Sequence, residues 1–284
     1  MTLSTATAPR VPADVSASRP EVYPKHWWGP LYAPMRDWQG RRVWLVGASS
    51  GIGLACAQAL HAAGAQVIVS ARRPREVLEW AARDPRVQWH ALDVTDAQAV
   101  AALAQRLASE GPLDLVVYCA GHYKAQRAEQ ADLQDWLRHD RINYQGALHV
   151  LHAVLPTLIA QQHGHFSLIS SVAGWRGLPN GLAYGPTKAA LTHLAETLYM
   201  DLQDLGVGVS VVHPGFVATP LTAQNQFTMP ALMPPAQAAQ QILRGWARGH
   251  FDIHFPKRFT LWLRLLRVLP YRWYFALVRR FTGL

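Results

Sequence analysis

Cysteine is nearly absent from this 284-residue chain, which has only Cys56 and Cys119. Two cysteines cannot form a disulfide framework, and their spacing is not that of a metal clip. The sequence therefore predicts a protein of a reducing compartment without a metal site. The first ten residues lack a long apolar run behind positive charge, which argues against a secretory signal and favours a cytoplasmic location.

Acidic residues are also scarce, with 18 of them against 27 lysines and arginines, and the formal net charge is +9. From Arg244 to the end the chain has nine basic residues and a single acidic one, Asp252. Such a concentration of charge favours an anionic partner. No nucleic-acid-binding motif accompanies the charge, so we do not expect nucleic acid to be that partner.

No segment is biased toward one or two residue types, and half of the residues are hydrophobic, which argues against a disordered chain. The length suits one principal α/β domain. Residues 1–40 contain six prolines and no regular apolar period, so we expect an irregular arm there. Its aromatic residues either pack on the body or lie at a membrane interface. They are Trp27, Trp28, Tyr32 and Trp38.

Residues 41–255 alternate short apolar runs with longer Ala- and Leu-rich segments, the pattern of βαβ units. They predict a single Rossmann-type, doubly wound parallel sheet with helices on both faces. The expected strands are 43–46, 67–70, 87–92, 115–118, 166–170 and 207–212. The expected helices are 53–63, 75–82, 97–109, 133–139, 144–162, 184–205 and 235–249. Ligands bind such sheets beyond the carboxyl ends of the strands.

A glycine-rich segment, Gly47-Ala48-Ser49-Ser50-Gly51-Ile52-Gly53, follows the first expected strand and opens a helix. Glycine allows the backbone to approach a ligand closely, and a helix N-terminus offers free N–H groups to a pyrophosphate. We therefore expect dinucleotide binding here. The binding residues would be Gly47, Ser49, Ser50, Gly51, Ile52 and Gly53.

The spacing G-x-x-x-G-x-G resembles the fingerprint of the short-chain dehydrogenase/reductase family, and the resemblance continues along most of the chain. After the second expected strand come Arg72 and Arg73, where an NAD enzyme would carry a carboxylate. Guanidinium groups bind phosphate through paired hydrogen bonds, so we expect NADP(H) to be favoured over NAD(H). The alternative is a solvated, basic start of the next helix.

Three further segments resemble cofactor-binding motifs of this family. Asp93 and Val94 match the adenine-side motif, although Asp93 could instead cap the next helix. Cys119-Ala120-Gly121 stands where most members have Asn-Ala-Gly, so a weak thiol partner replaces an amide. The segment from His213 to Thr219 resembles the motif near the nicotinamide amide, or is a plain turn. Its matching residues are Pro214, Gly215, Val217 and Thr219.

Tyr184 and Lys188 are spaced to lie on one face of a helix. A phenol has a pKa near ~10, and a neighbouring ammonium is expected to favour the phenolate. Ser171, thirteen residues before Tyr184, matches the family's catalytic serine. Asn143 matches the asparagine that holds a water linking the lysine to solvent. The resemblance implies that these four residues are catalytic, and that Tyr184 and Lys188 also contact the cofactor.

The resemblance implies an NADP(H)-dependent oxidoreductase in which Tyr184 exchanges a proton with a substrate carbonyl or hydroxyl. The two loops expected to shape the substrate site are apolar, which favours a small hydrophobic ketone, aldehyde or alcohol. They carry Trp175, Leu178, Leu182, Phe216, Leu221, Phe227 and Met229. We expect a homo-oligomer. One alternative is a non-catalytic, NADP-binding scaffold or redox sensor at a membrane. Another is an epimerase or dehydratase, but the chain leaves little room for a sugar-nucleotide domain.

Residues 256–284 alternate Leu, Trp, Phe and Tyr with Arg. Arg264, Arg267 and Pro270 interrupt the apolar run, so this segment does not read as a membrane span. We expect a basic amphipathic helical tail that lies on an anionic membrane surface, on its inner face, or that docks on the body or a neighbouring subunit. The apolar residues concerned are Trp262, Leu265, Leu266, Trp273 and Phe275.

Overall fold

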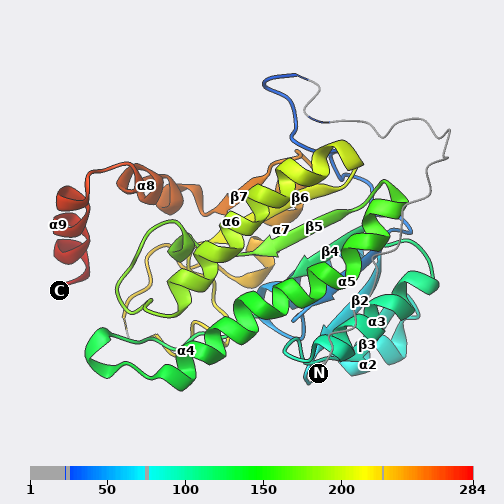
Figure 1. Ribbon diagram of the computed structural model, residues 1–284, viewed down its shortest axis with the longest axis horizontal. Helices are drawn as coiled ribbons and strands as arrows, with labels where there is room; N and C mark the ends of the chain where they lie inside the picture. Colours follow the sequence, from blue (N-terminus) through cyan, green and yellow to red (C-terminus); the bar gives the residue numbers. More distant parts are fainter. Residues whose placement is uncertain (1–22, 24–25, 74–76, 226, 284) are drawn as a thin grey trace, which may run out of the picture.

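The computed structural model describes residues 23, 26–73, 77–225 and 227–283. They contain a seven-stranded sheet in the order β3-β2-β1-β4-β5-β6-β7, in which every neighbouring pair is parallel (Figure 1). The strands are β1 (Arg42–Val46), β2 (Gln66–Ala71), β3 (Val87–Ala91), β4 (Leu115–Tyr118), β5 (His165–Ile169), β6 (Gly208–Pro214) and β7 (Asp252–Phe255).

The predicted parallel sheet is confirmed, and each of the six predicted strands lies within two residues of an observed one. The sequence did not predict β7. This strand has the sequence Asp-Ile-His-Phe, so it lacks the apolar run that marked the others. It nevertheless pairs with β6 along its whole length and completes the edge of the sheet.

Helices cover both faces of the sheet (Figure 1). They are α1 (Gly51–Ala62), α2 (Val77–Arg83), α3 (Ala97–Ser109), α4 (Leu133–His139), α5 (Gly146–Gln161), α6 (Tyr184–Leu202), α7 (Pro235–Trp246), α8 (Lys257–Arg267) and α9 (Tyr271–Thr282). The first residues of the predicted helix 75–82 lie outside the described part of the chain. A π-helix, Asp140–Gln145, joins α4 to α5 where the sequence predicted a break.

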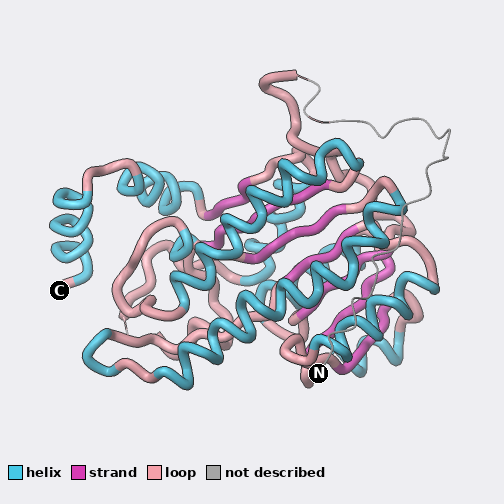
Figure 2. Tube along the Cα trace, viewed as in Figure 1, coloured by secondary structure: helices cyan, strands magenta, loops and turns pink. Residues whose placement is uncertain are grey.

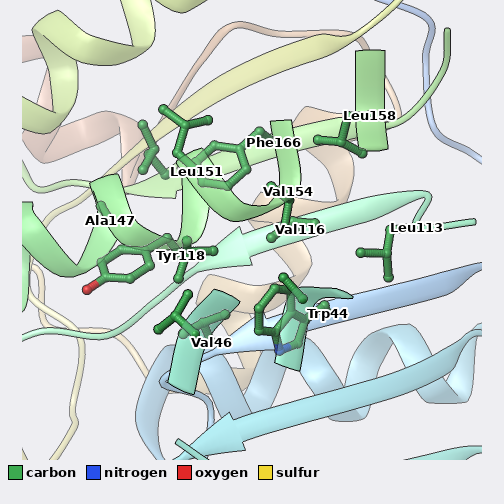
Figure 3. Close-up of a cluster of buried hydrophobic side chains, with 14 of the residues drawn as sticks. Trp44, Val46, Leu113, Val116, Tyr118, Ala147, Leu151, Val154, Leu158 and Phe166 are labelled. Carbon is green, nitrogen blue, oxygen red and sulfur yellow. The ribbon is translucent and has the colours of Figure 1, made fainter. Parts of the chain in front are cut away.

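 Two apolar layers hold the helices on the sheet, because alternate side chains of a strand point to opposite faces. Trp44 and Val46 of β1 belong to the first layer, which packs beneath α3, α5 and α6 and is drawn in part in Figure 3. Val43 and Leu45 belong to the second, beneath α1 and α7. All four side chains are fully buried, so the central strand is held from both sides.

The N-terminal arm packs on the body over part of its length. Tyr32 and Trp38 are buried, and the Trp38 ring meets the edge of Trp246 in α7 at a centroid distance of 5.9 Å. Trp27 and Trp28, in contrast, are 87% and 92% exposed. Residues 26–40 contain no helix or strand, and the rest of the predicted irregular arm, apart from Tyr23, lies outside the described residues.

The C-terminal tail is helical, as predicted, but it forms two helices. Val268, Leu269 and Pro270 separate α8 from α9, and Pro270 is the N-cap residue of the second helix. Both helices lie on the side of the molecule toward which the strand arrows point, and α9 stands at its margin (Figures 1 and 2). None of the described helices is long and apolar enough to cross a bilayer.

Candidate active site

The four residues predicted to be catalytic meet beyond the carboxyl ends of β4 and β5. Tyr184 opens α6, and the Nζ atom of Lys188, one turn later, lies 5.6 Å from the centroid of the Tyr184 ring. Ser171 follows β5 and forms a hydrogen bond with Tyr184. A Cβ atom built on Gly121 would lie 3.8 Å from both Asn143 Oδ1 and Lys188 Nζ. The structure thus brings a phenol, an ammonium, a hydroxyl and an amide together.

The expectation that the ammonium would lower the pKa of Tyr184 is wrong for this structure. Burial raises the pKa of the phenol to about 12, and the hydrogen bond with Ser171 acts in the opposite direction without overcoming it. Removal of water disfavours the phenolate. Tyr184 is therefore a protonated phenol at neutral pH, the form that can donate a proton.

Lys188 is also removed from water, with 4% of its surface exposed. Burial lowers the pKa of its ammonium to about 8. Nζ donates a hydrogen bond to the Ile169 carbonyl oxygen at 2.8 Å. An ammonium has three N–H donors, so two remain for other partners at this site.

Asn143 lies in the π-helix and is fully buried. Its Oδ1 accepts from the His122 backbone N–H at 2.6 Å, and its Nδ2 donates to the His122 carbonyl and to Thr187 Oγ1, both at 3.0 Å. The amide therefore ties the segment after β4 to the first turn of α6. Thr187 was not predicted. It lies between Tyr184 and Lys188 in the sequence, and only the spacing of those two residues was considered.

The two serines after β5 have different surroundings. Ser171 Oγ accepts from the Ala173 backbone N–H at 3.1 Å and caps a short 3₁₀ turn. Ser170 is buried, and its Oγ donates to the Lys188 carbonyl at 2.7 Å. Ser170 thus holds α6 in place, while Ser171 faces Tyr184.

The predicted phosphate loop connects β1 to α1. Gly47 and Gly51 adopt φ values of 85° and 58°, which are rare for residues with a side chain. A Cβ atom on Gly47 would collide with Ala120, and one on Gly53 with Ala48, so these glycines also serve internal packing. A larger residue at either position would displace backbone.

The N-terminus of α1 can receive an anion. The N-cap residue, Ser50, makes no side-chain hydrogen bond to the first turn. The helix therefore keeps free N–H groups and positive partial charge at this end. Gly51 lies against Thr219, whose Cγ2 atom would be 3.1 Å from an added Cβ. The loop after β6 thus meets the phosphate loop.

Arg72 and Arg73 directly follow β2 and are both exposed. Within the described ranges of the chain, neither forms an ion pair with a carboxylate. Asp93, the predicted adenine-side residue, accepts from the N–H and the hydroxyl of Thr95 at 2.9 and 2.8 Å. The cap of α3 is Asp96, not Asp93. Val94 is buried, so its side chain packs inside the body.

Cys119 keeps only part of the role that an asparagine would have. Its backbone N–H donates to the Val46 carbonyl at 2.8 Å and so continues the pairing of β1 with β4. The thiol reaches only the Val117 carbonyl, at 4.0 Å. Burial raises the pKa of this thiol to about 12, so it is not a thiolate. The backbone, rather than the side chain, joins the loop to the sheet.

The segment after β6 is held by its neighbours. Gly215 donates its N–H to the Phe255 carbonyl at 2.8 Å, and Val217 is buried and bridges to Met233. Pro214 is the last residue of β6. Thr219 Oγ1 lies 3.3 Å from Thr222 Oγ1. The segment is therefore an ordered loop at the carboxyl end of the sheet.

Tyr123 was not predicted, although its position after β4 could have indicated it. Its ring meets the Tyr184 ring edge-on at a centroid distance of 5.0 Å. Its hydroxyl donates to Asn225 Oδ1 at 3.2 Å. Tyr123 therefore joins the loop after β6 to the catalytic residues. Two of the predicted apolar residues, Phe216 and Phe227, lie in this loop after β6. Their rings pack together at a centroid distance of 5.6 Å.

A polar cluster adjoins the site and was also missed. His122 Nε2 lies 2.8 Å from Asp135 Oδ1, and His139 Nδ1 lies 2.8 Å from the Asp135 carbonyl. Ligating atoms of the three residues lie within 4.8 Å of one another, close enough to hold a metal ion. The prediction that the protein has no metal site was based on the number and spacing of its cysteines. It therefore does not apply to this cluster of two histidines and an aspartate. Gln126 also donates to Asp135 Oδ2, at 2.8 Å, so hydrogen bonds already satisfy this carboxylate.

A family model described as short chain dehydrogenase matches residues 41–229, which include all four candidate catalytic residues. The chain belongs to the short-chain dehydrogenase family. As a short-chain dehydrogenase it is an oxidoreductase that acts on CH–OH or C=O groups with NAD(P).

Two relatives illustrate the similarity of this short-chain dehydrogenase to known proteins. It is 36% identical over 254 residues to a protein of Myxococcus xanthus (strain DK1622) named uncharacterized oxidoreductase, which covers 87% of this chain and 99% of the relative. It is 34% identical over 188 residues to 2-keto-3-deoxy-L-fuconate dehydrogenase of Xanthomonas campestris pv. campestris, over 66% of this chain and 62% of that protein.

Solved structures agree on the fold. A short chain dehydrogenase of Burkholderia cenocepacia J2315 in complex with NADP has a TM-score of 0.76 at 22% identity, over 86% of this chain and 99% of that one. A family member from Burkholderia phymatum in complex with NAD has a TM-score of 0.74 at 24% identity, over 81% and 94%. Both cofactors occur among these neighbours, so the comparisons support NAD(P) binding in general.

Proposed function

We propose that this short-chain dehydrogenase interconverts a hydrophobic carbonyl compound and its alcohol with NADP(H), and that Tyr184 donates and accepts the proton. The observation that carries the proposal is the grouping of buried Lys188 with the partly buried side chains of Tyr184 and Ser171 at the carboxyl end of the sheet. Polar side chains that are fixed in place and largely shielded from water stabilise charge that develops on a substrate oxygen better than the same groups in solvent.

The proton transfer follows from the state of each group. Tyr184, with its raised pKa, begins protonated and gives its proton to the carbonyl oxygen during reduction. The ammonium of Lys188 stabilises the phenolate that forms, using an N–H that Ile169 does not occupy. Ser171 donates a hydrogen bond to the substrate oxygen. The bound nicotinamide supplies the hydride in reduction and accepts it in oxidation.

The residues present fit a dinucleotide. The uncapped N-terminus of α1 and the glycine turn before it suit the pyrophosphate. Gly121 leaves room beside Lys188, which would also hold the nicotinamide ribose. Asp93, exposed after β3, would contact the adenine. The segment after β6, from Pro214 to Thr219, would face the nicotinamide amide.

The preference for NADP(H) rests on Arg72, assisted by Arg73. Both are exposed at the end of β2, beside the phosphate loop, and neither forms an ion pair with a carboxylate in the described part of the chain. Arg72 is nevertheless near enough to Asp93 to lower the pKa of that carboxyl group. A guanidinium binds a 2′-phosphate through paired, charge-assisted hydrogen bonds. The uncharged 2′-hydroxyl of NAD(H) cannot form such a charged pair.

The substrate side is apolar on both of its loops, which suits a hydrophobic ketone, aldehyde or alcohol. Trp175 is buried beside the turn that Ser171 caps. Phe216 and Phe227 pack together on the opposite loop. Tyr123 is the polar exception, and its ring borders Tyr184.

The test is NADPH oxidation, followed by absorbance, with a panel of aliphatic and aromatic ketones. Tyr184→Phe should lower turnover by about 10²- to 10⁴-fold, because it removes the proton donor. NADPH binding, measured by fluorescence, should remain. Tyr199→Phe is a matched control, because Tyr199 lies on the same helix and its buried hydroxyl has no partner among the described residues.

Each other outcome has a definite meaning. Turnover that survives Tyr184→Phe contradicts the assigned role of the phenol. NADPH binding without Tyr184-dependent turnover of any ketone, or of any alcohol with NADP⁺, favours the alternative of a non-catalytic NADP-binding scaffold.

A further inference from the structure

The two C-terminal helices expose an unusual number of large apolar side chains. Eight of the eighteen exposed large hydrophobic residues in the described part of the chain lie between Leu261 and Phe281. They are Leu261, Trp262, Leu265, Val268, Tyr271, Trp273, Phe275 and Phe281. A soluble surface rarely groups so many apolar side chains unless they meet a partner. We call this set, together with the exposed arginines among them, the tail face.

The tail face is also strongly basic. Its exposed arginines are Arg258, Arg267, Arg272, Arg279 and Arg280. The chain has no acidic residue after Asp252, and the carboxylate of Asp252 is already bound to His213 and Arg264. No side-chain carboxylate of the tail is therefore available to neutralise these arginines.

The body of the protein leaves the tail face largely exposed, because it holds the tail mainly through other groups. Of the tail face, Tyr271 lies 4.6 Å from Arg176 by its ring centroid and is still 69% exposed. Arg176 donates to the carbonyl oxygens of Leu266 and Leu269 at 2.9 and 2.8 Å. Its guanidinium lies 4.0 Å from the centroid of the Tyr274 ring. The Tyr274 hydroxyl donates to the Gly177 carbonyl at 2.7 Å, and Tyr274 is only 2% exposed. Tyr274 thus faces the body.

The residues on either side of Tyr274 face water instead. Trp273 and Phe275 are 66% and 55% exposed, and Trp262 in α8 is 68% exposed. Helices that combine arginines with Trp, Phe and Leu bind lipid by inserting the apolar side chains among the head groups while the arginines contact anionic lipid. The composition and exposure of the tail face match that arrangement.

We infer that the tail face binds the surface of an anionic lipid bilayer, with α8 and α9 lying along it. A second copy of the same face is the less suitable occupant. It would place arginines opposite arginines without a carboxylate between them, and such like charges repel. Anionic head groups remove that repulsion and also accept the apolar side chains.

The anchor of the tail lies next to the proposed active site. Arg176 and Gly177 belong to the segment between Ser171 and Tyr184, so a tail bound to lipid brings this segment close to the bilayer surface. Substrates dissolved in the membrane would then be the natural class for the site. This consequence rests on the proposed function, whereas lipid binding itself does not.

Vesicle flotation of the full chain tests the inference. The protein should float with vesicles of phosphatidylglycerol and phosphatidylcholine, and bind vesicles of phosphatidylcholine alone at least about tenfold more weakly. The double variant Trp262→Asp, Trp273→Asp should lose at least about tenfold in binding to the anionic vesicles. The matched control is Trp27→Asp, Trp28→Asp, which replaces two even more exposed tryptophans of the N-terminal arm and should bind as the wild type does.

Several results would overturn the inference. Absence of wild-type flotation does so, as does equal loss of binding in the two double variants. Gel filtration tests the alternative that a second copy of the chain binds the tail face. If the wild type does not bind vesicles and the tail variant elutes as a smaller species than the wild type, the tail face serves self-association. NADPH binding without lipid shows that the variants are folded. Tyr184→Phe should float like the wild type. The lipid-binding result can therefore be interpreted even if the proposed catalytic function proves wrong.

Discussion

The start of α6 and the helix α9 carry similar side chains in opposite settings. Lys188 is buried and Tyr184 is partly buried, whereas Tyr271 and Arg272 of α9 are exposed. In α6, burial raises the pKa of the Tyr184 phenol and lowers the pKa of the Lys188 ammonium. In α9 the same kinds of groups stay in water. Burial, rather than residue type, separates the chemical region of this protein from its surface-binding region.

The two regions also differ in their relation to the family. The matched family region, 41–229, contains the candidate catalytic residues, and α7, α8 and α9 follow it. The candidate catalytic residues thus lie within the region that the family model matches, and the tail lies outside that region. Changes in the two regions should therefore affect different measurements.

The largest expected contrast comes from removing one amine in each region. Lys188→Met keeps the length of the buried side chain but removes its charge, so kcat/KM with a soluble ketone should fall by about 100-fold or more. Lys257→Met, in exposed α8, should change that value little. Steady-state kinetics measure both. A comparable loss in the two variants would break the proposed division between the regions.

A pair of arginine substitutions sharpens the contrast for the cofactor. Arg72→Ala should raise the KM for NADPH by about tenfold and leave that for NADH nearly unchanged, because only the 2′-phosphate would be lost as a partner. Arg272→Ala, in the tail, should affect neither. An equal effect of Arg72→Ala on both cofactors would remove the phosphate role assigned to it.

The pH dependence tests the state of Lys188. Its pKa is lowered to about 8, so the ammonium is present below that pH and is lost as the pH rises. Reduction needs the ammonium to stabilise the phenolate, so kcat/KM should fall by about threefold between about pH 7.5 and 8.5. A profile that stays flat through pH 9 would contradict this assignment. Tail variants should keep the wild-type profile.

The smallest effect concerns the contact that joins the regions. Asp252 binds His213 and Arg264, and these partners lower its pKa to about 2. Asp252→Asn should reduce the free energy of unfolding by about 1 kcal/mol, or the Tm by about 2–4 °C. The difference should disappear as the pH falls from about 4 toward 2, where the wild-type carboxylate is protonated. Exposed Asp201→Asn should melt like the wild type.

Much of the fold could be predicted because apolar runs and glycine turns are local signals. The strands of the shared region and the common helix face of Tyr184 and Lys188 are of this kind, whereas Ser171 was assigned through the resemblance to the family. β7 was missed because Asp252 and His254 break its apolar pattern, and its place is set by pairing with β6. Contacts between distant segments leave no local trace.

The same limit applies to the site. Spacing indicated that Tyr184 and Lys188 share a helix face, but it could not show how completely protein surrounds them. The predicted direction of the Tyr184 pKa was therefore wrong. Arg176 offered no signal either, since its partners lie about 90 residues later in the chain. Burial and long-range hydrogen bonds depend on the finished tertiary structure.

The π-helix at Asp140–Gln145 makes the place of Asn143 depend on residue count. A wider helical turn accommodates one more residue than an α-helix does. Deleting a single residue of the π-helix would restore α-helical geometry there. The segment before the deletion would then rotate by about 100° relative to α5. The Asn143 amide would then lose its hydrogen bonds to His122 and Thr187, although neither of these residues had been changed.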